Sequence, residues 1–167
     1  MMHNCKSTNS NFMSNFANNK TVNLQEQDCP KNGTCDVEIM ENKSIRLLKD
    51  GIGKIYPKVI DGNNIVILYT FKIGSPNNYQ DGHDSETLHI EINANTLDKL
   101  VDNDLKQINL LYGKHCFCKD IVGYYPIKKG QFSMQKLKNN KVQIKINFSE
   151  PKVGDRQVLK SIDLVLE

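Results

Sequence analysis

The chain has 167 residues, with 22 Lys and Arg against 19 Asp and Glu, no Trp, and a mean hydropathy of -0.51. This length supports one hydrophobic core, and no stretch approaches the roughly 18 consecutive apolar residues that a membrane-spanning helix requires. The net charge of +3 arises from 20 Lys spread along the chain and only two Arg, Arg46 and Arg156. Nucleic-acid-binding surfaces concentrate Arg, so these figures argue against a membrane-spanning protein and against nucleic acid as a partner.

Residues 1–28 differ in composition from the rest of the chain. Asn is interleaved with Ser and Thr, and too few apolar residues are present to offset the entropy of ordering the segment. We expect a flexible Asn/Ser-rich tether here and a single domain over 29–167. Cys5 precedes a polar run, as the first residue of a mature bacterial lipoprotein does, but no apolar signal segment comes before it. Cys5 is therefore either a lipidation site of a chain trimmed just upstream or an odd thiol in a polar tail.

From Cys29 onward, apolar residues recur with the period of two that is typical of β-strands with one face toward solvent. The alternation is clearest over 35–39, 87–92 and 141–148. Residues 65–73 are apolar at nearly every position and rich in β-branched side chains, which predicts a central strand covered on both faces.

Short turn sequences separate these runs, so the strands are expected to be antiparallel neighbours. Residues 95–105 carry the only helix-like spacing of Leu and Val, and Pro57 and Pro126 fall within strand-like runs, which places them at edges or bulges. About eight to ten short strands with this spacing predict an all-β fold, an antiparallel β-sandwich that is immunoglobulin-like or a related meander. An up-and-down barrel is the alternative.

Four of the five cysteines form two close pairs, Cys29 with Cys35 and Cys116 with Cys118. If Cys116 and Cys118 lie in a strand, they share a face about 6.6 to 6.8 Å apart, which is too far for a mutual disulfide. We therefore expect disulfides that join the early pair to the late pair. Local pairing of Cys29 with Cys35, a zinc site formed by all four cysteines, and reduced thiols are the alternatives. Oxidised cysteines would place the domain outside the cytosol.

The segment from Asp81 to His89 gathers two His, two Asp and a Glu, with Asp81, His83 and Asp84 on a predicted loop. These side chains are of the types that bind divalent ions, so a metal-binding protein centred on this segment is an alternative function. However, His89 alternates with apolar residues and is expected to face solvent together with Thr87 and Glu91. We therefore favour a polar loop without metal, and no cofactor.

Several aromatic residues cluster around Cys116 and Cys118, including the neighbours Tyr124 and Tyr125. One of these two is expected to face the core and the other the solvent, where it suits contact with a protein or a glycan. The pair His115 and Cys116 does not suit a nucleophile and base, because adjacent strand residues point to opposite faces. We therefore predict that the chain is not an enzyme.

Several stretches from Cys29 onward carry a resemblance to known proteins: CPKNGTC, GKIYP, GHDSE, LLYGKHCFCKD and GYYPIKKG. With these, the chain resembles a group of small bacterial secreted or lipoprotein-type β-sandwich proteins that has no assigned function. The resemblance implies export and adds no site residue. Together these observations predict an exported binding or structural module, outside the cytoplasm, that contacts a membrane only through a lipid anchor.

Overall fold

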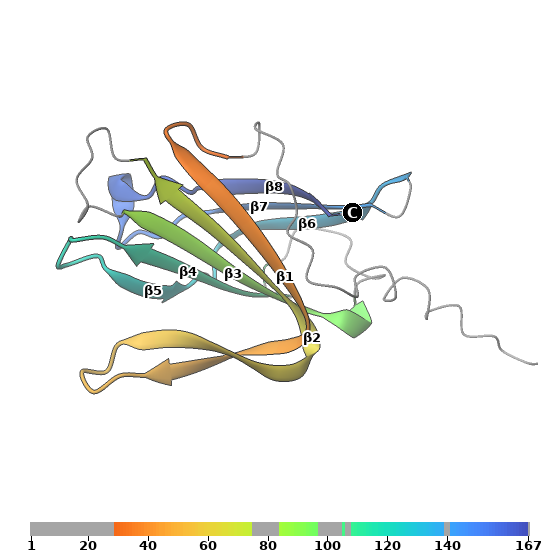
Figure 1. Cartoon of the computed structure of the whole chain (residues 1–167), viewed down its shortest axis with the longest axis horizontal. Helices are drawn as coiled ribbons and strands as arrows, with labels where there is room; N and C mark the ends of the chain where they lie inside the picture. The colour runs from red at the N-terminus through yellow and green to blue at the C-terminus, as the bar shows by residue number, and fades with distance from the viewer. Residues whose placement is uncertain (1–28, 75–83, 97–104, 106–107, 139–140, 167) are drawn as a thin grey trace, which may run out of the picture.

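Eight antiparallel strands form two sheets in the part of the chain that the computed structural model describes, residues 29–74, 84–96, 105, 108–138 and 141–166 (Figure 1). The strands are β1 (Gly33–Lys49), β2 (Ile55–Ile73), β3 (Ser85–Asn93), β4 (Ile108–His115), β5 (Gly123–Pro126), β6 (Gly130–Lys136), β7 (Val142–Phe148) and β8 (Ser161–Leu166). Short 3-10 turns, η2 (Ala94–Thr96) and η5 (Gly154–Arg156), follow β3 and precede β8.

The first sheet has the order β1-β2-β3-β4-β5 and the second β6-β7-β8, and each pair of neighbours is antiparallel. This confirms the predicted antiparallel sandwich. Within each sheet, every strand pairs with its neighbour in the sequence, so the connectivity is that of a meander and not the Greek key of an immunoglobulin domain.

The core lies between the two sheets, where apolar side chains of β2, β3 and β4 meet those of β6, β7 and β8. The rings of Tyr112 on β4 and Phe148 on β7 lie 5.6 Å apart across this interface. In β7 the four apolar residues are buried and the three polar residues between them are not, as the alternation predicted. The prediction for residues 65–73 is also confirmed, because β2 lies between β1 and β3 and Ile65, Val66 and Ile67 are all buried.

The β1-β2 hairpin is longer than the rest of the sheet and bends sharply near its middle. The register of the two strands shifts between Glu41 and Ser44, Asn42 has a φ of 53°, and Gly62 packs so closely on Ser44 that a larger residue would not fit. Beyond this bulge, residues 44–60 form a separate arm, the distal hairpin, which pairs only with itself. In Figure 1 the distal hairpin turns back beneath the first sheet and extends below β3, β4 and β5.

The bend and the ring of Tyr124 together explain why one prediction about β3 is wrong. His89 and Glu91 were expected to face solvent, but their exposed fractions are only 7% and 6%. The alternation identifies the two faces of the strand correctly, since Leu88, Ile90 and Ile92 are in the core. It does not reveal that the second face is covered too, by the ring of Tyr124 beside His89 and by the distal hairpin near Glu91.

Both prolines lie at sheet edges, as predicted. Pro57 lies on the distal hairpin, where β2 has lost β3 as a neighbour, and Pro126 ends the edge strand β5. The expected tether 1–28 with Cys5, and most of the expected helical turn at 95–105, lie outside the described residues. Within the described residues, no helix has the length and hydropathy needed to cross a membrane.

Candidate functional site

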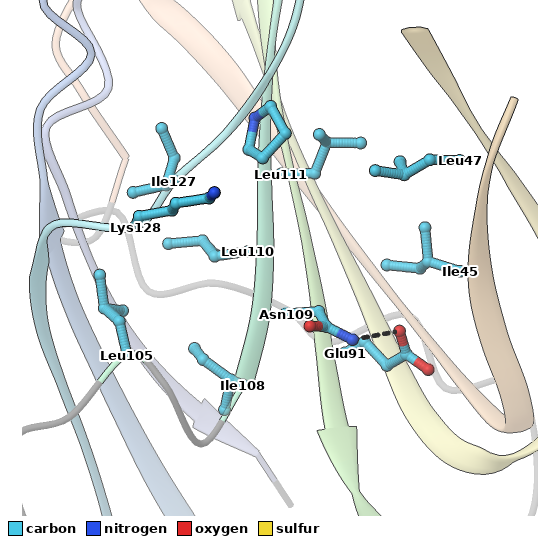
Figure 2. Close-up of a pocket in the computed structure, with 11 residues that line it drawn as sticks. Ile45, Leu47, Glu91, Leu105, Ile108, Asn109, Leu110, Leu111, Ile127 and Lys128 are labelled. Carbon is cyan, nitrogen blue, oxygen red and sulfur yellow. Dashed lines mark hydrogen bonds between the residues drawn. The ribbon is translucent and has the colours of Figure 1, made fainter. Parts of the chain in front are cut away.

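A cleft of about 520 Å³ opens between the distal hairpin and the edge of the first sheet (Figure 2). The distal hairpin forms one wall, facing Asn109 and Leu111 on the outer face of β4. Leu105, Leu110 and Ile127, which also belong to the core, form the opposite wall on the other face of β4, so the cleft wraps around the edge of this strand. Most of the lining is apolar: Ile45, Leu47, Leu105, Ile108, Leu110, Leu111, Pro126 and Ile127. A concave site of this size with few polar groups is typical of small-molecule binding sites in proteins.

Three polar side chains also line the cleft, namely Glu91, Asn109 and Lys128. The carboxylate of Glu91 accepts hydrogen bonds from Nδ2 of Asn64 at 2.6 Å and from Nδ2 of Asn109 at 3.1 Å. These amides hold the buried carboxylate in place on the hairpin side, whereas Lys128 reaches into the cleft from the opposite wall (Figure 2). The cleft therefore has an apolar body with one negative and one positive group on different sides.

The local sequence explains why the cleft stays open. Pro126 ends β5 because it has no N–H for a further ladder bond, and the chain then crosses to the second sheet. The next residue, Ile127, still donates its backbone N–H to the carbonyl oxygen of Leu110 at 2.8 Å, which fixes this wall beside β4. On the opposite wall, the bulge in the β1-β2 hairpin directs Ile45 and Leu47 toward β4.

A buried network of charges lies at the other end of β3 and β4. The ammonium group of Lys114 is 2% exposed and lies 2.9 Å from Oε1 of Glu86 and 2.8 Å from Oδ1 of Asp84. Burial alone would lower the pKa of Lys114, but the two carboxylates outweigh it and raise the pKa. Glu86 also accepts the backbone N–H groups of Val158 and Leu159, at 2.9 and 2.6 Å, and so joins β3 to the segment before β8.

A cluster of rings covers the outer face of the first sheet near the same end. The ring of Tyr124 lies edge-on to the rings of His89 and His115, with centroids 6.0 and 5.1 Å away. Burial, together with the nearby His115, lowers the pKa of His89 to about 4, and Nδ1 of His89 has no hydrogen-bond partner among the described residues. Burial also lowers the pKa of His115, whose Nε2 lies 3.2 Å from the hydroxyl of Thr87. These histidines therefore pack as neutral rings.

The predicted disulfides between the two cysteine pairs are not formed. Cys29 is bonded to Cys35 and Cys116 to Cys118, with Cα atoms 5.7 and 5.1 Å apart. The prediction failed because Cys116 and Cys118 lie in a bend that follows β4 and not in a strand, so the strand spacing does not apply. This pairing also differs from a zinc site of four cysteines, which needs four thiolates.

The predicted metal-binding segment is only partly described. Asp81 and His83 lie outside the described residues. Asp84 is paired with Lys114, and His89 lies on β3 beneath Tyr124. Among the residues that the structure does describe, no group of three or more His, Cys, Asp or Glu side chains is placed to hold a metal ion.

Tyr124 and Tyr125 point to opposite faces of β5, as predicted. Tyr125 packs on the core, near Tyr112, and its hydroxyl donates to the carbonyl oxygen of Ile121 at 2.8 Å. Tyr124 lies on the other face but is half-buried between the two histidine rings. Neither tyrosine is among the described residues that line the cleft, and their role in contacting a protein or a glycan stays a prediction.

Sequence reasoning missed the cleft and all of its lining residues. The alternation of Ile45 and Leu47 with Ser44 and Arg46 indicates a strand with one apolar face. It carries no information on where that face packs. Only the bend near Asn42 brings these residues opposite β4.

No family model, no curated protein and no solved structure matches the chain.

Proposed function

We propose that the protein is an exported binding module that holds an apolar ligand in the cleft between the distal hairpin and β4. The observation that carries this proposal is the cleft itself, about 520 Å³ in volume and lined mainly by aliphatic side chains. Burying an apolar ligand there removes both surfaces from water, which is favourable by about 25 cal/mol per Å² of apolar area. Leu47 is 46% exposed and would lose much of that exposure on binding.

The two charged residues suggest the orientation of the ligand. Glu91 is fixed by two amides on the hairpin side, whereas Lys128 is exposed at the opposite wall. An anionic group would be repelled by Glu91 and attracted by Lys128. We therefore propose a ligand with an apolar body and one anionic end, oriented toward Lys128.

Export is supported by the cysteine chemistry. Both described cysteine pairs form disulfides, which persist in oxidising compartments and are rare in the cytosol. Anchoring through Cys5 follows only from the resemblance and from the residues around it, and is part of the same proposal. Binding rather than catalysis is proposed because the described residues that line the cleft include no nucleophile in contact with a base.

The experiment is a fluorescence titration with 8-anilinonaphthalene-1-sulfonate, an apolar probe with one anionic group. Leu47→Lys should weaken binding about tenfold or more, since it places a charge against the apolar body of the probe. Ile52→Lys is the matched control, because Ile52 lies at the turn of the same hairpin, is 80% exposed and does not line the cleft. Equal loss of binding in both variants, or no binding by the wild-type protein, would contradict the proposal.

A further inference from the structure

We propose that the Cys116–Cys118 disulfide is a thiol–disulfide exchange site that reacts with a cysteine of another polypeptide. This goes beyond the proposed binding function, because it concerns the opposite end of β4 from the cleft. The site is a hollow of about 460 Å³ that is lined by both cysteines and by Asp84, Lys114, Arg156 and Val158, with Phe117 between the cysteines.

The position of this disulfide suits reaction better than structural support. Cys116 and Cys118 lie in a bend, are half-exposed and are separated by one residue. A bond that closes so short a loop restricts the unfolded chain less than one that closes a longer loop. In contrast, Cys35 lies within β1, where the hydroxyl of the buried Tyr69 donates to its Sγ at 2.9 Å.

Charges around the hollow favour release of a thiolate. Lys114 is already paired with Asp84 and Glu86. Arg156, on η5, lines the hollow and has no carboxylate within ion-pair distance among the described residues. A guanidinium that lines the same hollow attracts a thiolate formed there, which makes that sulfur a better leaving group.

The apolar surface around the disulfide points to a polypeptide as the source of the thiol. Phe117, between the two cysteines, is 90% exposed, and Val158 across the hollow is 42% exposed. Exposed aromatic side chains are common anchors at protein interfaces. A cysteine with apolar neighbours would therefore be held against Phe117 during the reaction.

The reaction transfers two electrons from two thiols to the disulfide. A partner thiolate attacks Sγ of one cysteine, the S–S bond breaks, and the other cysteine leaves as a thiolate that is protonated by solvent. A second thiolate of the partner polypeptide then attacks the partner's own sulfur in the mixed disulfide. This step releases the first cysteine as a thiol and yields an oxidised partner, with Cys116 and Cys118 both reduced.

The first test follows reduction of the full oxidised chain by glutathione, with thiol alkylation and peptide mapping at set times. The Cys116–Cys118 bond should be reduced about tenfold faster than Cys29–Cys35, or more, while the far-ultraviolet circular dichroism stays unchanged. Arg156→Gln should slow the reaction several-fold, because it removes a cation that attracts the leaving thiolate. Arg46→Gln is the control, because Arg46 is exposed on the distal hairpin, away from the hollow.

The second test compares glutathione with a reduced peptide that carries one cysteine between apolar residues. The peptide should react several-fold faster, and Phe117→Ala should remove this advantage without changing the rate with glutathione. Similar reduction rates for both disulfides, or reduction only when the protein unfolds, would overturn the exchange site. Equal rates for peptide and glutathione would overturn the assignment of a polypeptide partner. Neither test depends on binding in the cleft, so failure of one proposal leaves the other standing.

Discussion

Lys114 and Glu86 form an ion pair in the interior of the protein, with Nζ of the lysine 2.9 Å from Oε1 of the glutamate and side chains that are 2% and 0% exposed. The same carboxylate binds the backbone N–H groups of Val158 and Leu159. Glu86 thus connects β3, β4 and the segment that leads into β8. The pair holds one end of the sandwich together, and its removal should affect stability more than the loss of an exposed ion pair.

Lys114→Met should lower the free energy of unfolding by about 3 to 5 kcal/mol, because it leaves Glu86 charged and buried without its cation. Lys145→Met is the matched control, since the Lys145–Asp163 pair is half-exposed and worth less than about 1 kcal/mol. Urea unfolding of both variants measures the difference. The double variant Lys114→Met/Glu86→Met should recover part of the loss. If Lys114→Met and Lys145→Met lowered the free energy of unfolding by similarly small amounts, the Lys114–Glu86 pair would not be structurally important.

Stability should fall as the pH is lowered through the range in which free histidine titrates. The pKa of buried His89 is depressed from its usual 6.5 to about 4, so the unfolded chain binds a proton that the folded protein does not. The stabilisation is fully present above pH 6.5 and is lost as the pH falls toward 4, by up to about 3 kcal/mol. His89→Gln should flatten this pH dependence in urea unfolding measured between about pH 7 and pH 4. An unchanged slope would mean that His89 titrates normally in the folded protein.

Gly113→Ala should destabilise the protein by about 1 to 3 kcal/mol through overpacking. A Cβ at this position would overlap with the hydroxyl of Thr87 and would lie 2.8 Å from the ring of Tyr124 and 2.9 Å from Nε2 of His115. Gly51→Ala should be nearly neutral by comparison, because no heavy atom lies within 4 Å of the added Cβ. Thermal unfolding of the two variants distinguishes a requirement for space at Gly113 from a general cost of replacing glycine.

Peptide mapping without reduction should find each disulfide within a single fragment, one containing CPKNGTC and the other HCFC. Loop-closure entropy for such short loops amounts to about 2 kcal/mol for Cys29–Cys35 and about 1.5 kcal/mol for Cys116–Cys118. Replacing either pair by serine should therefore be tolerated. A fragment with Cys29 or Cys35 linked to one with Cys116 or Cys118 would show that the bonds join the early and late cysteines instead.

The fold class could be predicted from the sequence because each strand carries its own evidence. Alternation over 142–148 and the continuous apolar run at 65–73 depend on local residue order alone, and both agree with the burial in the structure. The short turns between strands likewise favour antiparallel neighbours, which is the observed meander.

The cleft and the cysteine pairing could not be predicted in the same way because both depend on departures from regular strands. The bulge near Asn42 redirects the distal hairpin over a face that the alternation assigns to solvent, and so buries Glu91. The bend after His115 brings Cys116 and Cys118 closer together than a strand allows. Neither departure has a residue pattern that distinguishes it from an ordinary turn or strand.

The most direct test of the binding proposal is an NMR titration of the full chain, labelled at the methyl groups of Ile and Leu, with 8-anilinonaphthalene-1-sulfonate. The largest shift changes should occur at Ile45, Leu47, Leu110 and Leu111, which line the cleft, and the methyl group of Ile52 should not respond. Changes of equal size at methyl groups outside the cleft, or none at all at millimolar probe, would contradict the proposal.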